Sequence, residues 1–455
     1  MNGEETRTIT SPPVRSSARD ADADADRHTP GKPRTPGTRA WMTRLVIVGI
    51  VLTALNLRPA ITSSGALLEE VRDGLGMSGS VAGLLTSVPP LCFAVFGVMA
   101  PRLARRFGLA AVVAAGMLAI GTGLVVRPFA GSTAGFLVAT AVALMGIAVS
   151  NVLMPVIVKR WFPDRVGSMT GLYSMALALG TATAAAATVP VTRALGGSWQ
   201  AGLAVWAALA AVAVLPWLPL VRAKGTPLSA AGTAAAPVAG TVTEGRPEPV
   251  TEGRQEPAPL RITRSRTAWA LAVFFGLQAT AAYITMGWMA QIFRDAGVPA
   301  GTAGLLLAVT MVMGVPLAFV IPRLATRLPH QGPIVIALGL CGFAGYAGLY
   351  LAPAGGAWAW ALLLGISNCA FPLALTMVGM RARTGAGVAQ LSAFAQSTGY
   401  LISIPGPLLV GVLYQHSGGW GLPIALMAGL MVPQVVVGVL AGRDRTVEDE
   451  AAVTR

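Results

Sequence analysis

The sequence predicts an all-α membrane protein with twelve transmembrane helices in two pseudo-symmetric halves of six. Three observations support this fold class. Of the 455 residues, 54% are hydrophobic and only 11% are charged, whereas soluble domains carry about 25% charged residues. Twelve apolar runs are long enough to cross a bilayer, for which about 20 residues suffice. The first six runs and the last six share sequence motifs at equivalent places.

The twelve predicted spans are mostly joined by short connections. Their approximate limits are 43–68, 79–101, 109–127, 133–158, 166–191, 199–221, 267–293, 301–322, 332–351, 357–379, 387–413 and 420–441. A long connection holds a tandem repeat beginning at Thr243 and Thr251, and its Pro, Gly and charged residues indicate a flexible linker. The expected domains are a disordered tail (1–42), a six-helix bundle (43–221), the linker (222–266), a second bundle (267–441) and a tail (442–455).

The basic residues predict the orientation, because Lys and Arg are enriched in the cytoplasmic loops of membrane proteins. If both termini are cytoplasmic, the outside loops hold only four arginines: Arg72, Arg127, Arg193 and Arg294. The sequence therefore predicts cytoplasmic termini. The formal net charge is +14, and most of the basic residues lie in these cytoplasmic segments. They are therefore expected to set the topology and to contact membrane lipids, and no nucleic-acid partner is needed to explain the charge.

The two halves repeat each other in sequence. Residues 82–107 align without gaps to 303–328, and both contain Ala-Gly-Leu-Leu followed by Pro-Arg-Leu-Ala-x-Arg. The motif Ser-Asn-x-x-x-Pro occurs at 150–155 in the fourth span and at 367–372 in the tenth. These matches predict parallel halves related by an axis along the membrane normal, which is the major-facilitator arrangement.

Arg58 is the most informative single residue, because it falls near the middle of the first apolar run. A charge at membrane depth costs at least ~2.5–3.5 kcal/mol on insertion scales and marks a functional site by default. Pro59 removes a backbone donor and predicts a bend at Arg58. The guanidinium is expected to bind an anion through its fork of donors, with a structural contact to helix carbonyls as the alternative.

Several segments resemble a known family. The loop at 97–108 resembles the major-facilitator loop signature, with Pro101 where an Asp is usual and Ala104 where a Gly is usual. Residues 55–63, 171–177, 372–376 and 391–401 resemble the cyanate/nitroimidazole (CynX/NimT) branch. The resemblance implies a secondary transporter of small anionic or polar solutes that works by alternating access, with spans 1, 4, 7 and 10 lining a central cavity. We also expect it to be a monomer.

Polar residues of the cavity-lining and flanking spans are the candidate substrate-binding set. These residues are Arg58, Thr62, Asn151, Tyr173, Gln278, Tyr283, Asn368, Gln396 and Tyr400. Packing or hydrogen bonding between helices is the competing role for most of them, and for Thr62 it is a hydrogen bond to its own helix. The arginines of the two repeated loops are candidate gating residues, with topology anchoring as their alternative: Arg102, Arg105, Arg106, Arg323 and Arg327. Trp288 is expected in an interfacial aromatic belt.

The sequence also argues against several functions. No Asp or Glu lies in the middle of a span and all three His lie in tails or loops, so a proton relay has no obvious carrier. Walker, HExxH and paired-carboxylate motifs are lacking, as is any metal-ligand spacing of the three Cys. We therefore expect no enzyme, no metal and no cofactor. A bias toward Ala, Gly, Val and Arg favours a bacterial gene and a plasma-membrane location.

Two alternatives stand beside the anion carrier. A broad drug or metabolite exporter of the same fold would use apolar, Met-rich cavity walls, such as those from Met286, Met289, Met311 and Met313. A non-transporting membrane sensor or scaffold would use the tail and the linker to bind partners.

Overall fold

The computed structural model describes residues 36–222 and 262–453 of the chain. The expected linker over 223–261 and the expected disordered tail over 1–35 lie outside the described residues. The first helix already begins at Pro36, within the predicted tail. The helices of the first half are α1 (Pro36–Asn56), α2 (Pro59–Ala66), α3 (Leu68–Leu75), α4 (Gly79–Phe107), α5 (Leu109–Val126), η1 (Arg127–Phe129), α6 (Thr133–Trp161), η2 (Pro163–Arg165), α7 (Val166–Ala194), α8 (Trp199–Ala204), α9 (Trp206–Val214) and α10 (Trp217–Arg222).

The second half follows after the undescribed segment. Its helices are η3 (Ile262–Arg264), α11 (Arg266–Asp295), α12 (Ala300–Val312), α13 (Gly314–Arg327), α14 (Gly332–Leu351), α15 (Ala357–Asn368), α16 (Ala370–Met380), α17 (Gly385–Ser403), α18 (Pro405–Ser417), α19 (Gly421–Ala441) and α20 (Val447–Val453). The described residues form twelve helical segments long and apolar enough to cross a membrane. Each overlaps one predicted run, so the predicted span count is confirmed.

Several spans are broken, and proline explains most of the breaks. The first span bends between α1 and α2 directly before Pro59, as predicted. The eleventh breaks at Ile404 before Pro405, and the tenth breaks at Cys369, shortly before Pro372. By contrast, α6 runs unbroken through Pro155, so the repeated Ser-Asn-x-x-x-Pro motif bends only one of the two halves.

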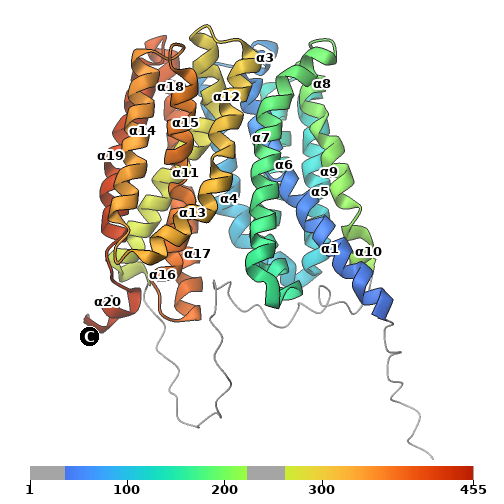
Figure 1. The fold of residues 1–455 in the computed structure, drawn as a ribbon. Coiled ribbons are helices and arrows are strands. Elements are labelled where there is room, and N and C mark those ends of the chain that lie inside the picture. Colours follow the sequence, from blue (N-terminus) through green and yellow to red (C-terminus); the bar gives the residue numbers. More distant parts are fainter. Residues whose placement is uncertain (1–35, 223–261, 454–455) are drawn as a thin grey trace, which may run out of the picture. The chain divides into compact units, whose positions relative to one another are not determined.

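The halves pack in corresponding ways (Figure 1). In the first half α5 packs on α6, and in the second half α14 packs on α15, which are the third and fourth spans of each. Between the halves, α2 contacts α11, α4 contacts α18 and α7 contacts α12. These three crossings place the first, second and fifth spans of one half against the other half.

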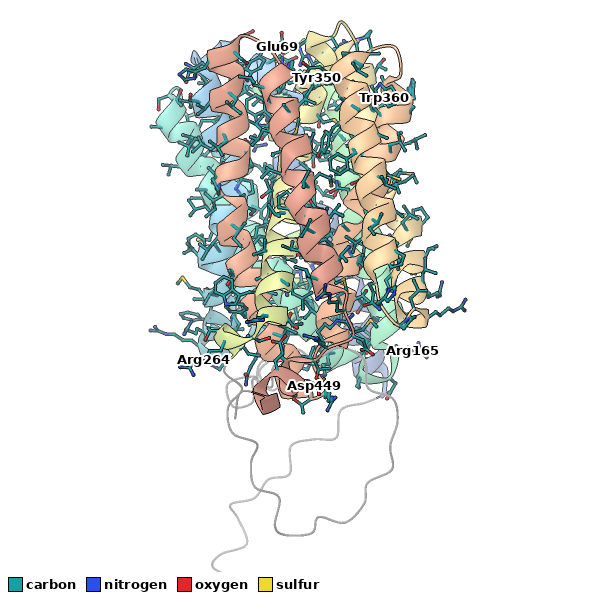
Figure 2. All side chains as sticks on the ribbon, turned by 90° about the vertical axis from the view of Figure 1, so that its left-hand side faces the viewer. Glu69, Arg165, Arg264, Tyr350, Trp360 and Asp449 are labelled. Atoms are coloured by element: carbon teal, nitrogen blue, oxygen red, sulfur yellow. The ribbon has the colours of Figure 1, made fainter. Side chains whose placement is uncertain are left out.

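The two ends of the bundle differ. Glu69 of α3 lies at one end, whereas Asp449 of α20 lies with Arg165 and Arg264 at the other (Figure 2). We refer to them as the α3 end and the α20 end. A buried apolar cluster with members from both halves, among them Leu68, Leu85 and Trp288, fills the α3 end.

Backbone contact and polar pairs close the α3 end between the halves. Gly65 of α2 lies so close to the Met286 carbonyl of α11 that no Cβ would fit. Arg294 pairs with Glu69 at 2.7 Å and with Glu70 at 2.8 Å, joining α11 to α3. The two carboxylates therefore take part in the contact between the halves.

The C-terminal tail folds back as α20 and caps two helices of the second half. The Glu450 carboxylate accepts hydrogen bonds from Ser265 Oγ (2.6 Å) and Thr267 Oγ1 (2.7 Å) at the start of α11. The Glu448 carboxylate accepts from the backbone N–H groups of Arg383 and Thr384 at the start of α17. Carboxylates are favourable at helix N-termini, so α20 fastens α11 and α17 together at the α20 end.

Candidate functional site

The break in the first span positions Arg58. Its backbone lies outside the helical region (φ −127°, ψ −27°) as the residue preceding α2. On one side of the break, Asn56 Nδ2 donates to the carbonyls of Leu52 and Leu209 at 2.8 and 3.1 Å. On the other side, Thr62 Oγ1 donates to the Arg58 carbonyl at 3.3 Å. Asn56 and Thr62 thus bond backbone carbonyls on either side of the bend.

Aromatic side chains surround the Arg58 guanidinium. Its Cζ lies 6.0 Å from the centre of the Phe93 ring. The hydroxyls of Tyr173, Tyr283 and Tyr400 lie close enough to the guanidinium to interact with its charge. Four spans therefore contribute rings around one cation: α4, α7, α11 and α17.

Arg58 has no carboxylate partner among the described residues, whose ion pairs all involve Arg294 or Arg383. The side chain is only half-buried. A cation at this depth is stabilised by aromatic faces and hydroxyl oxygens, yet its five donors retain capacity for an anion.

A cavity of about 620 Å³ lies beside this group, between α4, α6 and α17. Three of the predicted binding residues line it: Asn151, Gln396 and Tyr400. The Phe93 ring also lines it and stacks on Tyr400 with 5.1 Å between ring centres. The lining continues to Arg105 and Arg160 near the α20 end, so the cavity lies on the side opposite the closed α3 end.

Tyr173 and Asn151 form a pair beside the cavity. The Tyr173 hydroxyl donates to Asn151 Oδ1, and the Asn151 amide N–H₂ can then donate to another acceptor. Gln396, on the opposite wall, donates to Ser392 Oγ at 2.8 Å within its own helix. Arg58, Asn151, Tyr173, Tyr283, Gln396 and Tyr400 are thus the predicted residues that the structure brings together.

Three other predicted residues are placed elsewhere. Gln278 is 1% exposed; its Nε2 donates to the Asn368 backbone carbonyl (3.0 Å) and Oδ1 (2.9 Å), while its Oε1 accepts from Gln434 at 2.7 Å. This chain joins α11, α15 and α19 inside the second half. Thr62 is fully buried and bonded to its own helix. None of these three residues lines the 620 Å³ cavity, and their role in binding stays a prediction.

The candidate gating arginines are exposed and have few partners among the described residues. Arg102 donates to the Val98 carbonyl at 3.4 Å, and Arg106 lies over the Phe107 ring. Arg105 reaches the cavity lining, whereas Arg323 and Arg327 are exposed near the end of α13. Their role in gating stays a prediction.

Sequence reasoning misplaces two residues and misses Phe93. Trp288, expected in an interfacial belt, is fully buried, and its Nε1 donates to Thr86 Oγ1 at 3.1 Å across the halves. Arg127, expected in an outside loop, is 1% exposed, because η1 turns its side chain into the bundle toward α2. Phe93 lies in a uniformly apolar stretch, so only its neighbours reveal its place at the site.

Comparison with known proteins decides the family. The model of the Major Facilitator Superfamily matches residues 47–389. The chain belongs to the Major Facilitator Superfamily. Its relatives are transporters, so the chain is a transporter of small solutes and not an enzyme.

Within this superfamily, the chain resembles members named for different solutes. It is 33% identical to the uncharacterized transporter YycB of Bacillus subtilis, with 88% of this chain and 94% of the relative covered. It is 31% identical to the 2-nitroimidazole transporter of Escherichia coli (89% and 96% covered). It is 28% identical to the cyanate transport protein CynX of the same organism (85% and 95% covered). The predicted CynX/NimT resemblance is confirmed.

Solved structures of the superfamily share the fold at low identity. The nucleoside transporter NupG superimposes with a TM-score of 0.65 at 14% identity, covering 89% of this chain and 98% of that chain. The inward open xylose transporter XylE from E. coli gives 0.65 at 11% identity, with 91% and 99% covered. The major-facilitator fold is therefore confirmed.

Proposed function

We propose that this transporter carries a small, planar, anionic or strongly polar solute, and that Arg58 is its principal binding residue. The supporting observation is a half-buried guanidinium, without a carboxylate among the described residues, beside the 620 Å³ cavity. A planar anion matches the fork of guanidinium donors, and the stacked rings of Phe93 and Tyr400 suit a flat molecule.

The names of the relatives agree with this chemistry. Beside the nitroimidazole and cyanate transporters, a 92-residue segment is 35% identical to a putative anionic 4-hydroxy-benzoate permease of Thauera aromatica. Cyanate is a linear anion, and the other two solutes are flat rings with polar groups. Solutes of this kind place negative or electron-rich oxygen next to Arg58.

The transport cycle follows from the two ends. The cavity extends toward the α20 end while the α3 end is closed, and alternating access requires the reverse arrangement in another state. We propose cytoplasmic termini in the plasma membrane, on the strength of the arginine distribution. The α20 end is then cytoplasmic, and the structure corresponds to an inward-facing state. The bundles over 43–221 and 267–441 are the proposed moving units, working as a monomer that contacts membrane lipids.

The described residues do not favour the exporter alternative. Met286 and Met289 are buried in the core at the α3 end and do not line the cavity. The cavity walls are mainly apolar, with polar groups from Asn151, Gln396 and Tyr400 that can orient a solute.

Ligand-dependent thermal stabilisation tests the proposal. Cyanate, benzoate and 2-nitroimidazole are added to the wild type, Arg58→Gln and Arg58→Lys. A ligand that binds the folded state stabilises it by RT ln(1 + [L]/Kd), so we expect stabilisation of the wild type, less of Arg58→Lys and none of Arg58→Gln. Equal stabilisation of all three proteins by every ligand would show that Arg58 is not the binding residue.

A further inference from the structure

A buried arginine, Arg127, binds the helix that follows Arg58. Arg127 reaches from η1, at the end of the third span, to α2. Its Nη1 donates to the Ala60 carbonyl at 2.9 Å and to Ser64 Oγ at 2.8 Å, and its Nη2 donates to Ser63 Oγ at 3.2 Å. The guanidinium also lies 5.9 Å from the centre of the Phe136 ring. Every hydrogen bond that its side chain makes in the described part of the chain therefore ends on one short helix.

That helix needs support from outside. The eight residues of α2 follow the break at Arg58 and end at a second break at Leu67 (φ −111°, ψ 23°). All eight are buried, yet a helix of this length is marginal without tertiary contacts. The break at Arg58 separates α2 from α1, and only Leu67 links α2 to α3, so contacts from other helices help to fix the place of α2.

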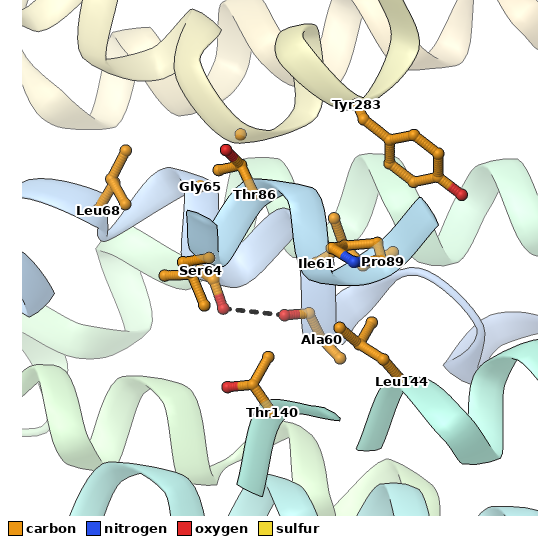
Figure 3. A pocket seen from close by; sticks show the side chains of 12 residues that line it. Ala60, Ile61, Ser64, Gly65, Leu68, Thr86, Pro89, Thr140, Leu144 and Tyr283 are labelled. Atoms are coloured by element: carbon orange, nitrogen blue, oxygen red, sulfur yellow. Dashed lines mark hydrogen bonds between the residues drawn. The ribbon is translucent and has the colours of Figure 1, made fainter. Parts of the chain in front are cut away.

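α2 is held between Arg127 and α11. Gly65 meets the Met286 carbonyl of α11 so closely that a side chain would not fit. A small cavity of about 20 Å³ adjoins the same stretch, lined among others by Ser64, Thr140 and Tyr283 (Figure 3). This is about the space of one water molecule. The void gives α2 room to shift if its bonds to Arg127 are lost.

The charge of Arg127 has no other evident use. No carboxylate pairs with it among the described residues, and its Nε has no hydrogen-bond partner there. A buried charge is costly unless it is fully hydrogen-bonded. The planar guanidinium of an arginine can, however, donate hydrogen bonds to three acceptors on one helix face at once.

We propose that Arg127 is a positioning residue of the transport site: it holds α2 in place and thereby keeps Arg58 beside Phe93 and Tyr283. This inference rests on the proposed binding role of Arg58. The placement of α2 can nevertheless be measured without any solute, so the two proposals can fail separately.

Cysteine reactivity tests the placement in the full chain, reconstituted in liposomes. The reporter cysteines are introduced into a cysteine-free variant that carries Cys92→Ala, Cys341→Ala and Cys369→Ala. Arg58→Cys reports on the start of α2, and Ser392→Cys, on the cavity wall of α17, is the reference. The probe is a negatively charged methanethiosulfonate. When Arg127→Gln is added to the Arg58→Cys protein, the labelling rate at position 58 is expected to rise about tenfold. The reason is that the charge-assisted hydrogen bonds from Arg127 to α2 are lost.

The controls separate positioning from general loosening. Arg127→Lys keeps the charge and one donor direction, so it is expected to restore most of the wild-type rate at position 58. Arg193→Gln removes an exposed arginine at the same end and is expected to change neither rate. If Arg127→Gln does not fold, the Ser63→Ala/Ser64→Ala double variant, which removes two acceptors, must produce the same selective rise.

Two results overturn the inference: an unchanged rate at position 58 in folded Arg127→Gln, or an equal rise at positions 58 and 392. If instead the selective rise occurs while Arg58→Gln still binds every ligand in the thermal assay, the positioning of α2 stands and the binding role of Arg58 falls.

Discussion

Asn151 and Asn368 occupy equivalent places in the two halves, yet their surroundings differ. Asn151 lines the cavity and accepts a hydrogen bond from Tyr173, close to Arg58. Asn368 is bonded twice by Gln278, which in turn is bonded by Gln434. The asparagine of the first half therefore faces the cavity, whereas the asparagine of the second half is bonded within its own bundle. The repeat supplies the same amide to both halves, and the choice of partner decides whether it serves binding or stability.

Substitution of Arg58, which lies in the first half, is expected to have the largest effect on solute binding. Arg58→Gln is expected to weaken anion binding about 100-fold, because a hydrogen bond to a charged group contributes about 1.5–3 kcal/mol and a tenfold change corresponds to about 1.4 kcal/mol. The melting temperature without ligand should hardly change, since the side chain is only half-buried. Calorimetric titration measures the affinity, and Arg58→Lys is the matched control with partial loss. A tight anion complex of Arg58→Gln would contradict the asymmetry between the halves.

Gln278→Leu tests the second half, where we expect the opposite pattern. The substitution leaves the buried groups of Asn368 and Gln434 without their partner, at a cost of about 1–3 kcal/mol in stability. Solute affinity is expected to change less than about threefold, because Gln278 does not line the 620 Å³ cavity. Thermal unfolding and ligand titration on the same preparation separate the two effects. A large loss of affinity at unchanged stability would place Gln278 in the binding site.

Tyr173→Phe sharpens the comparison at Asn151. The variant removes the hydroxyl that bonds Asn151 Oδ1 and frees the amide to rotate. We expect an affinity loss of about three- to tenfold, corresponding to one neutral hydrogen bond of ~0.5–1.5 kcal/mol. Tyr346→Phe, on a buried tyrosine of α14 distant from these residues in the helix order, is the control. Equal effects of the two substitutions on affinity would argue against a special role of the Tyr173–Asn151 pair.

The smallest expected effect concerns acid and α20. Burial raises the pKa of Glu450, but hydrogen bonds from Ser265 and Thr267 outweigh burial and lower it overall. A carboxyl with a lowered folded-state pKa contributes stability above its unfolded pKa of about 4.3, and this contribution is lost as pH falls through the folded value. Wild type should therefore lose slightly more thermal stability than Glu450→Gln between neutral pH and pH about 4. Parallel pH profiles would show that the contact of α20 with α11 adds no stability.

The fold and the position of Arg58 within the membrane can be predicted from the sequence, because both follow from local chemistry. Apolar runs set the spans, and Pro59 sets the bend that exposes Arg58. The partners of the amides are not predictable, since Gln278 reaches Asn368 only through the packing of α11 on its neighbours. Arg127 is misplaced for a similar reason: an arginine at the end of an apolar run looks like a loop residue, and only the η1 turn sends it inward.

The closed α3 end also determines where a membrane voltage falls. Water entering the cavity would carry the potential of one compartment as far as Phe93 and Tyr400, so most of the voltage drop would lie across the packed layer that closes the α3 end. A full charge crossing that layer exchanges about 2.3 kcal/mol per 100 mV. If the carried solute is an anion, each turnover of the site is therefore an electrical event, driven or opposed by the membrane potential itself.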